Sequence, residues 1–146
     1  MEIRVFGLVL LLVLCAALPA ESQNWAAFRR KHIYPSMDET RCTDTINDRG
    51  INSGGTCKKM NSFILATDDQ VKAVCGAAGR PVRQNLRESN NPFLVVTCRL
   101  KPGSNPCKYD GPKRTQCITI ACEKGFPVHY ERERPGQPGQ PCNKNP

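Results

Sequence analysis

The stretch CKKMNSF, residues 57–63, decides the fold of this chain. It places a cysteine and two lysines directly before a predicted strand, Asn61–Ala66, which is rich in aromatic and β-branched residues. On its N-terminal side, residues 48–56 read DRGINSGGT and contain three glycines, which is typical of a loop. The chain therefore changes here from loop to strand, with a cysteine and two cations at the junction.

The first 22 residues have the features of a secretory signal peptide. Arg4 precedes an apolar run, Val5–Leu18, that is too short to span a membrane. Small residues stand at the −3 and −1 positions of a cut after Ser22, which would leave Gln23 as the first residue. A cut after Ala20 is the alternative, but it places a leucine at −3 and fits less well.

The mature chain, residues 23–146, is expected to form one domain of 124 residues. Removing the signal peptide takes away one arginine and two acidic residues, so 20 basic and 11 acidic residues remain, a net charge of +9. Such a charge favours polyanionic partners, namely nucleic acid, heparin-like glycans or anionic lipids. The alternative is that the charge only keeps a secreted protein soluble. We expect a soluble, extracellular monomer.

Eight of the nine cysteines remain in the mature chain. An even number of cysteines in a small secreted domain predicts four disulfides, for which 105 pairings are possible. A metal site is disfavoured because no Cys-x-x-Cys pattern occurs, and four residues separate even the closest pair, Cys117 and Cys122. The eight cysteines are Cys42, Cys57, Cys75, Cys98, Cys107, Cys117, Cys122 and Cys142.

Helices are predicted in the N-terminal half. Trp25, Phe28 and His32 are spaced along one helix face, and Pro35 predicts the end of that helix. Two further helices are predicted over Cys42–Ile46 and over residues 68–75. A capping-box pattern at residues 67–70 precedes the last of these.

Strands dominate the rest of the chain, so the predicted fold class is α+β. Residues 133–146 contain four prolines and two glycines and are expected to form a tail without a core of its own. Beyond residue 80 the predicted strands are 82–87, 92–101, 115–122 and 127–131.

Three segments, FRRKHI (28–33), CKKMNSF (57–63) and FPVHY (126–130), closely resemble the pancreatic ribonuclease superfamily in their order and in the cysteines around them. The family signature Cys-Lys-x-x-Asn-Thr-Phe is present with Ser62 in place of the threonine. The resemblance covers residues 23 to about 130. It implies three short helices packed on a curved antiparallel sheet, with four disulfides.

The resemblance also implies a disulfide pattern. Within the family, the cysteine distribution of this sequence resembles that of the amphibian onconase-like ribonucleases. Digestive mammalian members have a cysteine pair in the loop after the third helix, whereas residues 76–91 contain no cysteine here. As in amphibian relatives, Gln23 would cyclise to pyroglutamate. The implied pairs are Cys42–Cys98, Cys57–Cys107, Cys75–Cys122 and Cys117–Cys142.

The family cleaves single-stranded RNA after pyrimidines, with the ribose 2′-hydroxyl as nucleophile, and produces a 2′,3′-cyclic phosphate. The resemblance implies that His32 is the general base, His129 the general acid and Lys58 the cation that stabilises the phosphorane. Lys31 would add a second phosphate contact. Glu131 stands where the pancreatic enzyme has an aspartate that orients the acid, and its greater length leaves that role open. RNA carries its own nucleophile, so no cofactor or metal is expected. The alternative role for His32, which stands on an apolar helix face, is that of a core residue.

Recognition of the base is expected to fall mainly to Ser62, because the family threonine reads the pyrimidine edge with its hydroxyl and its backbone N–H. Ser62 lacks the methyl group that restricts threonine rotamers, so a somewhat looser pyrimidine site is expected. Asn61 and Phe63 would support this pocket, and the ring of Tyr130 would pack against the base. Glu123 matches a position that contacts a purine on the 3′ side, or it is a solvated turn residue.

A different class of function competes with this interpretation. A weakly catalytic host-defence or cell-surface protein could act through its charge of +9 alone. The intact set of His32, Lys58 and His129 favours the enzyme.

Overall fold

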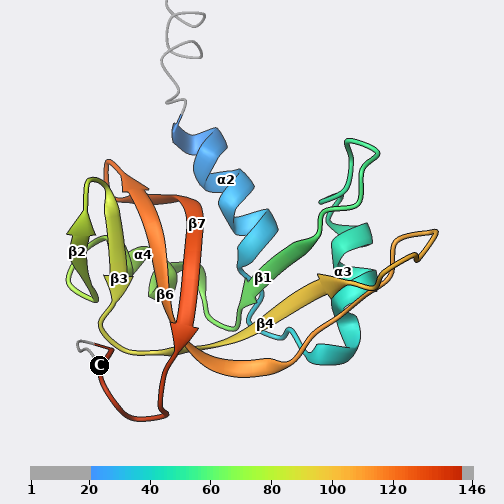
Figure 1. The fold of residues 1–146 in the computed structure, drawn as a ribbon. Coiled ribbons are helices and arrows are strands. Elements are labelled where there is room, and N and C mark those ends of the chain that lie inside the picture. The colour runs from blue at the N-terminus through green and yellow to red at the C-terminus, as the bar shows by residue number, and fades with distance from the viewer. Residues whose placement is uncertain (1–20, 143–146) are drawn as a thin grey trace, which may run out of the picture.

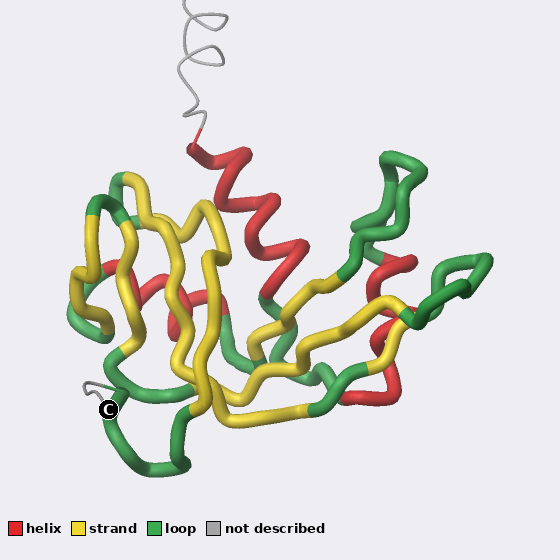
Figure 2. Tube along the Cα trace, viewed as in Figure 1, coloured by secondary structure: helices red, strands yellow, loops and turns green. Residues whose placement is uncertain are grey.

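Helix α2 (Glu21–His32) runs between two arms of one antiparallel sheet (Figure 1). The computed structural model describes residues 21–142, so residues 1–20 of the expected signal peptide lie outside the described residues. Along the chain most helices come before most strands, which confirms the predicted α+β class. Figure 2 shows the helices in red and the strands in yellow. No helix among residues 21–142 is long and apolar enough to cross a membrane.

The sheet has seven strands in the order β1-β4-β6-β3-β2, with β5 paired to β4 and β7 paired to β6. The first residues of β6 pair with β4, and residues 119–121 pair with β3. This long strand therefore connects the two arms seen in Figure 1. The strands are β1 (Met60–Ile64), β2 (Gly79–Arg83), β3 (Leu86–Ser89), β4 (Phe93–Leu100), β5 (Tyr109–Asp110), β6 (Lys113–Glu123) and β7 (Phe126–Pro135).

The end of α2 is fixed to β1. The helix ends before Pro35, as predicted, and Phe28 and His32 lie on its buried face. Ile33 then forms a parallel bridge with Ile64, and the Tyr34 N–H donates to the Ile64 carbonyl at 3.0 Å. The segment CKKMNSF and the last turn of α2 are therefore neighbours.

Arg49 caps the C-terminal end of α2. Its Nη1 donates to the carbonyls of Arg29, Arg30 and Ile33 at 3.3, 3.0 and 2.7 Å. Carbonyls in the last turn of a helix lack partners inside the helix, so these bonds supply what the helix cannot. The guanidinium also lies 4.5 Å from the centre of the Tyr34 ring.

The remaining helices are short. The predicted capping box is present: Thr67 Oγ1 accepts from the Gln70 N–H at 3.2 Å, and Gln70 Oε1 accepts from the Thr67 N–H at 2.9 Å. The helix predicted over residues 68–75 begins there and changes to a 3₁₀ turn midway. These elements are η1 (Glu39–Arg41), α3 (Cys42–Asp48), α4 (Asp68–Lys72) and η2 (Ala73–Cys75).

Two buried clusters lie on opposite faces of β1, because neighbouring side chains of a strand point in opposite directions. Ile64 belongs to the cluster under α2 and α4, whereas Phe63 belongs to the cluster next to α3. The first cluster contains Phe28, Ile33, Ile64, Ala66, Val71, Val74, Val95, Ile118 and Ile120. The second contains Met37, Cys42, Ile46, Phe63, Val96, Cys98 and Tyr109.

The single strand predicted over residues 82–87 is wrong, because the chain makes a hairpin there. β2 ends at Arg83, Gln84 has a φ of 48°, and β3 begins at Leu86. The turn contains no glycine, so the sequence gives little sign of it. Pro81 lies inside β2, which is possible because β2 is an edge strand.

Residues 21–142 contain four disulfides, and they are the four pairs that the family resemblance implies. Cys42–Cys98 joins α3 to β4, and Cys57–Cys107 joins the loop before β1 to the loop after β4. Cys75–Cys122 ties η2 to β6, and Cys117–Cys142 ties β6 to the segment after β7.

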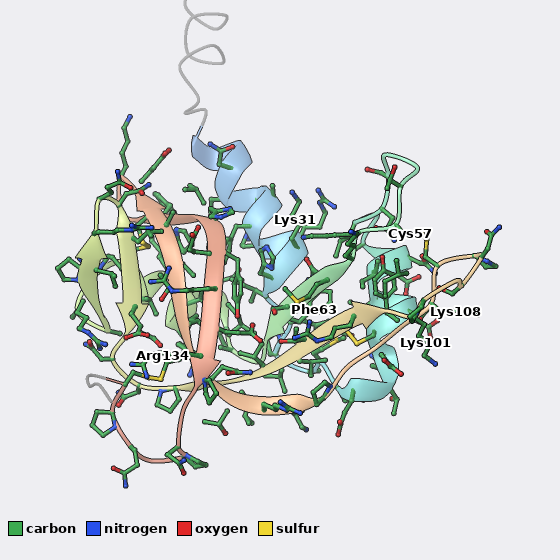
Figure 3. The ribbon with its side chains drawn as sticks, viewed as in Figure 1. Lys31, Cys57, Phe63, Lys101, Lys108 and Arg134 are labelled. Carbon is green, nitrogen blue, oxygen red and sulfur yellow. A yellow bond between two sulfur atoms is a disulfide. The ribbon has the colours of Figure 1, made fainter. Side chains whose placement is uncertain are left out.

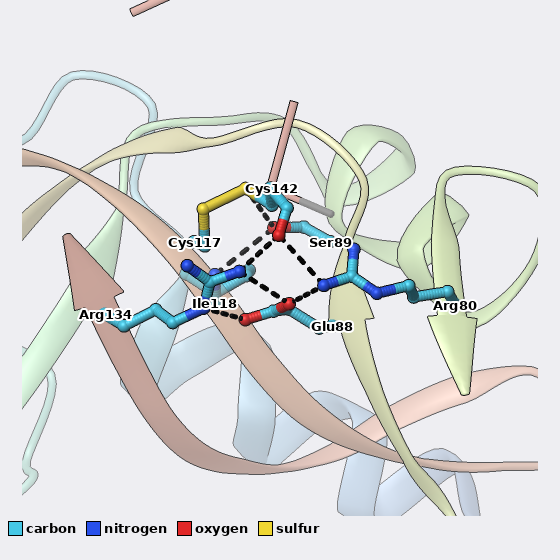
Figure 4. Close-up of a disulfide and its surroundings, with 7 residues drawn as sticks. All are labelled: Arg80, Glu88, Ser89, Cys117, Ile118, Arg134 and Cys142. Atoms are coloured by element: carbon cyan, nitrogen blue, oxygen red, sulfur yellow. Dashed lines mark hydrogen bonds and ion pairs between the residues drawn. A yellow bond between two sulfur atoms is a disulfide. The ribbon is translucent and has the colours of Figure 1, made fainter. Parts of the chain in front are cut away.

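The C-terminal segment starts later than predicted and is anchored at its end. β7 continues to Pro135, so residues 133–135 belong to the sheet rather than to the predicted tail. The Cys142 carbonyl accepts from Arg134 and from Arg80, and both arginines pair with the buried carboxylate of Glu88 (Figure 4). The Cys142 N–H donates to the Asn90 carbonyl at 2.7 Å.

Candidate active site

A pocket of about 560 Å³ lies where α2, β1 and β7 meet, and it contains both histidines of the chain. Figure 3 shows Lys31 near the end of α2, between that helix and the arm that carries β1. The lining residues are Lys31, His32, Lys58, Met60, Asn61, Ser62, Arg99, His129, Tyr130, Glu131, Arg132 and Glu133.

The His32 ring is fixed on three sides. It is buried, with 9% of its surface exposed. Its Nδ1 lies 2.8 Å from the Ser62 carbonyl oxygen, which can only accept, so Nδ1 carries the hydrogen. The ring stacks on Tyr130, with 5.0 Å between ring centres, and packs at a tilt against Phe28. Nε2 is therefore the nitrogen of neutral His32 that has a free lone pair.

Burial lowers the pKa of His32 from 6.5 to about 3, because the charged imidazolium loses its hydration. The hydrogen bond to the Ser62 carbonyl opposes this change, whereas the positive charges of Lys58 and Lys31 and the nearby His129 add to it. Near neutral pH the His32 ring is therefore neutral and able to accept a proton.

A chain of hydrogen bonds links the two lysines of the pocket. Lys58 Nζ donates to Asn61 Oδ1 at 2.8 Å, and Asn61 Nδ2 donates to the Lys31 carbonyl at 2.8 Å. Burial lowers the pKa of Lys58, and the charge of Lys31 lowers it further. Asn61 thus holds the Lys58 ammonium against the end of α2, on the same side as His32.

His129 is the exposed histidine of the pair. Its Nε2 lies 3.1 Å from Glu131 Oε1, so the longer carboxylate does reach the ring. About 62% of the His129 side chain is exposed, in contrast to His32. One buried and one exposed imidazole therefore share a single pocket.

The other side of the pocket is organised around Glu133. Its Oε1 accepts from the Ser62 hydroxyl at 2.7 Å and from the Tyr130 hydroxyl at 2.6 Å. Its Oε2 accepts from the Thr97 hydroxyl at 2.5 Å and from Gln116 Nε2 at 3.3 Å. Burial and the adjacent Glu133 carboxylate raise the pKa of Tyr130, so this hydroxyl remains a donor.

The family model of the pancreatic ribonucleases matches residues 23–131, about three quarters of the chain. The chain belongs to the pancreatic ribonuclease family. The matched residues include the two histidines, the segment CKKMNSF and seven of the eight cysteines of the four disulfides.

Individual ribonucleases agree with the family match. A ribonuclease of Chelonia mydas is 42% identical over 116 residues, which cover 75% of this chain and 97% of the relative. Angiogenin of Mus musculus is 37% identical over 134 residues, 88% of this chain and 89% of the relative. The solved structure of zebrafish RNase5 is 40% identical, with a TM-score of 0.72 over 79% of this chain and 98% of that one. These are turtle, mouse and fish proteins, so an amphibian subgroup stays a prediction.

Two of the residues singled out in the sequence, Phe63 and Glu123, do not line the pocket. Phe63 is fully buried in the cluster next to α3 and does not line the pocket, so it supports β1 from behind. Glu123 is exposed at the turn between β6 and β7 and is not among the lining residues, which agrees with the solvated-turn alternative. Lys31, Asn61, Ser62 and Tyr130 line the pocket as expected.

Glu133 is not predicted from the sequence, because an irregularity in β7 turns it toward the pocket. Thr119 pairs with Arg132 but Ile120 pairs with Tyr130, so Glu131 is an extra residue in β7. In a regular strand, Tyr130 and Glu133 would point to opposite faces, since their offset is odd. The bulge reverses this relation. No pattern in the sequence predicts it.

Proposed function

We propose that this protein is a secreted endoribonuclease that cleaves single-stranded RNA after pyrimidines. The relatives that are named ribonucleases support RNA as the substrate. The observation that carries the proposal is the pairing, in one pocket, of a buried His32 whose free nitrogen is Nε2 with an exposed His129. An acid–base pair needs one imidazole that takes a proton and one that gives it, and both histidines line this pocket.

In the proposed reaction, Nε2 of His32 takes the proton of the ribose 2′-hydroxyl while the 2′-oxygen attacks phosphorus. The bond from phosphorus to the 5′-oxygen breaks, and His129 gives that oxygen a proton. A 2′,3′-cyclic phosphate and a free 5′-hydroxyl result. Because the nucleophile belongs to the RNA, the reaction needs no metal ion.

Charge on the phosphorane would be stabilised by Lys58, which Asn61 holds at 2.8 Å, with Lys31 as a second phosphate contact. Fixed positive groups of this kind act where charge develops in the transition state. Ser62 would read the pyrimidine edge, and the backbone carbonyl that orients His32 belongs to this same residue. Base reading and proton transfer would thus share one rigid peptide.

Secretion is proposed from the predicted signal peptide, and binding to anionic glycans or lipids is proposed from the charge of +9. The protein is proposed to act as a monomer. The competing function is polyanion binding with little catalysis.

Cleavage of the dinucleotides UpA and ApA tests the proposal. UpA should be cleaved with production of a cyclic phosphate, ApA should be a much poorer substrate, and both should be unaffected by chelators. His32→Ala and His129→Ala should each lose about 10²–10⁴-fold in kcat/KM. Lys101→Ala is the control, because Lys101 pairs with Asp110 at an exposed site away from the pocket lining. Equal rates for wild type and His129→Ala would leave polyanion binding as the function.

A further inference from the structure

A side chain of the glycine-rich loop, residues 48–56, is bonded to the main chain of Lys58. Oδ1 of Asn52 accepts from the Lys58 N–H at 2.8 Å, so its Nδ2 faces away from that N–H. Nδ2 donates to the Tyr109 hydroxyl at 3.0 Å, and this hydroxyl donates to the Lys58 carbonyl at 2.5 Å. The three bonds form a closed ring that uses both main-chain groups of Lys58.

Asn52 determines where the hydrogen of the Tyr109 hydroxyl points. A phenol has one hydrogen to donate and can also accept on its oxygen. Because Nδ2 of Asn52 donates to that oxygen, the hydrogen is directed to the Lys58 carbonyl. Tyr109 is itself fixed, since it is buried and its N–H donates to Thr43 Oγ1 of α3 at 2.8 Å. The ring of hydrogen bonds therefore has a rigid support.

These bonds fix the direction of the Lys58 side chain. The N–H belongs to the peptide plane before Lys58 and the carbonyl to the plane after it, and each plane is rigid. Two planes that are held in this way leave little freedom in φ and ψ, and hence in the direction from Cα to Cβ. The disulfide Cys57–Cys107 holds the preceding residue but does not by itself orient the two planes.

The loop that carries Asn52 is fastened to α2. Arg49 caps this helix through the carbonyls of its last turn. Arg30 of the same turn donates through Nη1 to the Arg49 carbonyl at 2.8 Å. The loop is therefore bonded at one end to the helix turn that carries His32, and through Asn52 to Lys58.

We propose that Asn52 is a positioning residue, which holds the main chain of Lys58 and so sets the place of its ammonium relative to His32. This inference rests on the proposed function, in which Lys58 stabilises the phosphorane. Asn61 holds the ammonium end of the side chain at 2.8 Å, whereas Asn52 holds its origin. Both are needed, because a displacement of about 1 Å of a group that acts on the transition state can cost about 10²-fold in rate.

The first test is the cleavage of UpA by Asn52→Ala. Two lost hydrogen bonds of ordinary strength correspond to about 5- to 150-fold, so kcat should fall within this range with little change in KM. Asn90→Ala is the matched control, because Asn90 also bonds a main-chain group, the Ala77 carbonyl at 3.0 Å, and does not line the pocket. This control should leave kcat unchanged. Equal kcat for wild type and Asn52→Ala would overturn the inference, since the neighbouring disulfide would then suffice.

A double-mutant cycle separates positioning of Lys58 from a general structural role. In the Lys58→Ala background there is no ammonium to place, so adding Asn52→Ala should not lower kcat further. A loss of equal size in both backgrounds would overturn the proposal. If Asn52→Ala does not fold, Asn52→Asp serves instead. It has the same shape and accepts from the Lys58 N–H, but it draws the Tyr109 hydrogen away from the Lys58 carbonyl. Its loss of kcat should also vanish in the Lys58→Ala background.

Failure of the inference can be distinguished from failure of the proposed function. If wild type does not cleave UpA, an NMR titration of the Lys58 ammonium decides about Asn52. Burial and the charge of Lys31 lower the pKa of Lys58 in the folded protein. This pKa should rise toward its ordinary value in Asn52→Ala, because the side chain leaves its place, and should not change in Asn90→Ala. An unchanged pKa in Asn52→Ala would show that Asn52 does not position Lys58.

Discussion

His32 is held by Ser62: Nδ1 of the ring donates to the Ser62 carbonyl at 2.8 Å, while the Ser62 hydroxyl donates to Glu133. The same residue thus fixes the tautomer of one histidine and faces the pocket with its side chain. A shift of β1 would therefore move the proposed base and the proposed base-reading group together.

The pH profile of cleavage should have an unusually low acidic limb. A general base must be neutral, and burial lowers the pKa of His32 to about 3. The acidic limb of kcat/KM for UpA, which reports the free enzyme, should therefore lie well below pH 6.5. Lys31→Ala should raise this limb because it removes a positive charge near His32, and Lys101→Ala should not. An acidic limb at or above pH 6.5 in wild type would contradict the burial argument.

The stability of the protein should also depend on His32. Its folded-state pKa is lowered from 6.5 to about 3, so the unfolded chain binds more protons between these values. The free energy of unfolding should therefore fall as the pH decreases from about 6.5 toward 3. Urea unfolding at several pH values in this range should give a smaller slope of unfolding free energy against pH for His32→Gln, because glutamine does not titrate. Identical slopes for the two proteins would mean that His32 is not buried as a neutral ring.

Variants of Lys58 and Asn61 should affect the chemical step more than substrate binding. Lys58→Ala should lower kcat by about 10²–10³-fold with a smaller change in KM, because its charge acts mainly on the transition state. Asn61→Ala should lower kcat less, since it leaves the ammonium in place but removes the 2.8 Å bond that positions it. Single-turnover and steady-state kinetics measure both effects. An increase in KM alone for Lys58→Ala would assign this residue to ground-state binding.

The mature protein should begin with a pyroglutamate at Gln23. This follows from the predicted cut after Ser22, and a mass spectrum of the secreted chain tests it directly. A mass that corresponds to an open Gln23, or to a start after Ala20, would show that processing differs.

The sequence predicts those features that depend on short segments. The capping box at Thr67 gave the start of α4, and the three family segments gave the four disulfides and most of the pocket lining. Features that depend on backbone geometry were missed. The hairpin at Gln84 has a positive φ at a residue other than glycine, and the bulge at Glu131 reverses the faces of β7. Both lie between consecutive strands, β2–β3 and β6–β7, but neither contains a glycine that would mark a tight turn or a bulge in the sequence.

The disulfide Cys117–Cys142 should stabilise the fold more than it supports catalysis. It closes a loop of 25 residues, for which chain entropy predicts about 3.5 kcal/mol. The loss in a Cys117→Ala/Cys142→Ala variant should be smaller, because Arg134, Arg80 and Asn90 also hold the segment by hydrogen bonds to Cys142.

Denaturant unfolding of this double variant measures the change in stability. Its kcat/KM for UpA should stay within a few-fold of wild type, because His32 and Lys58 lie on elements that the other disulfides and the core retain. Adding Glu88→Gln should cost more stability in the double variant than in wild type, since the two arginines then become the main anchor of the segment. A large loss of activity without a loss of stability would instead show that this disulfide positions β7 and His129.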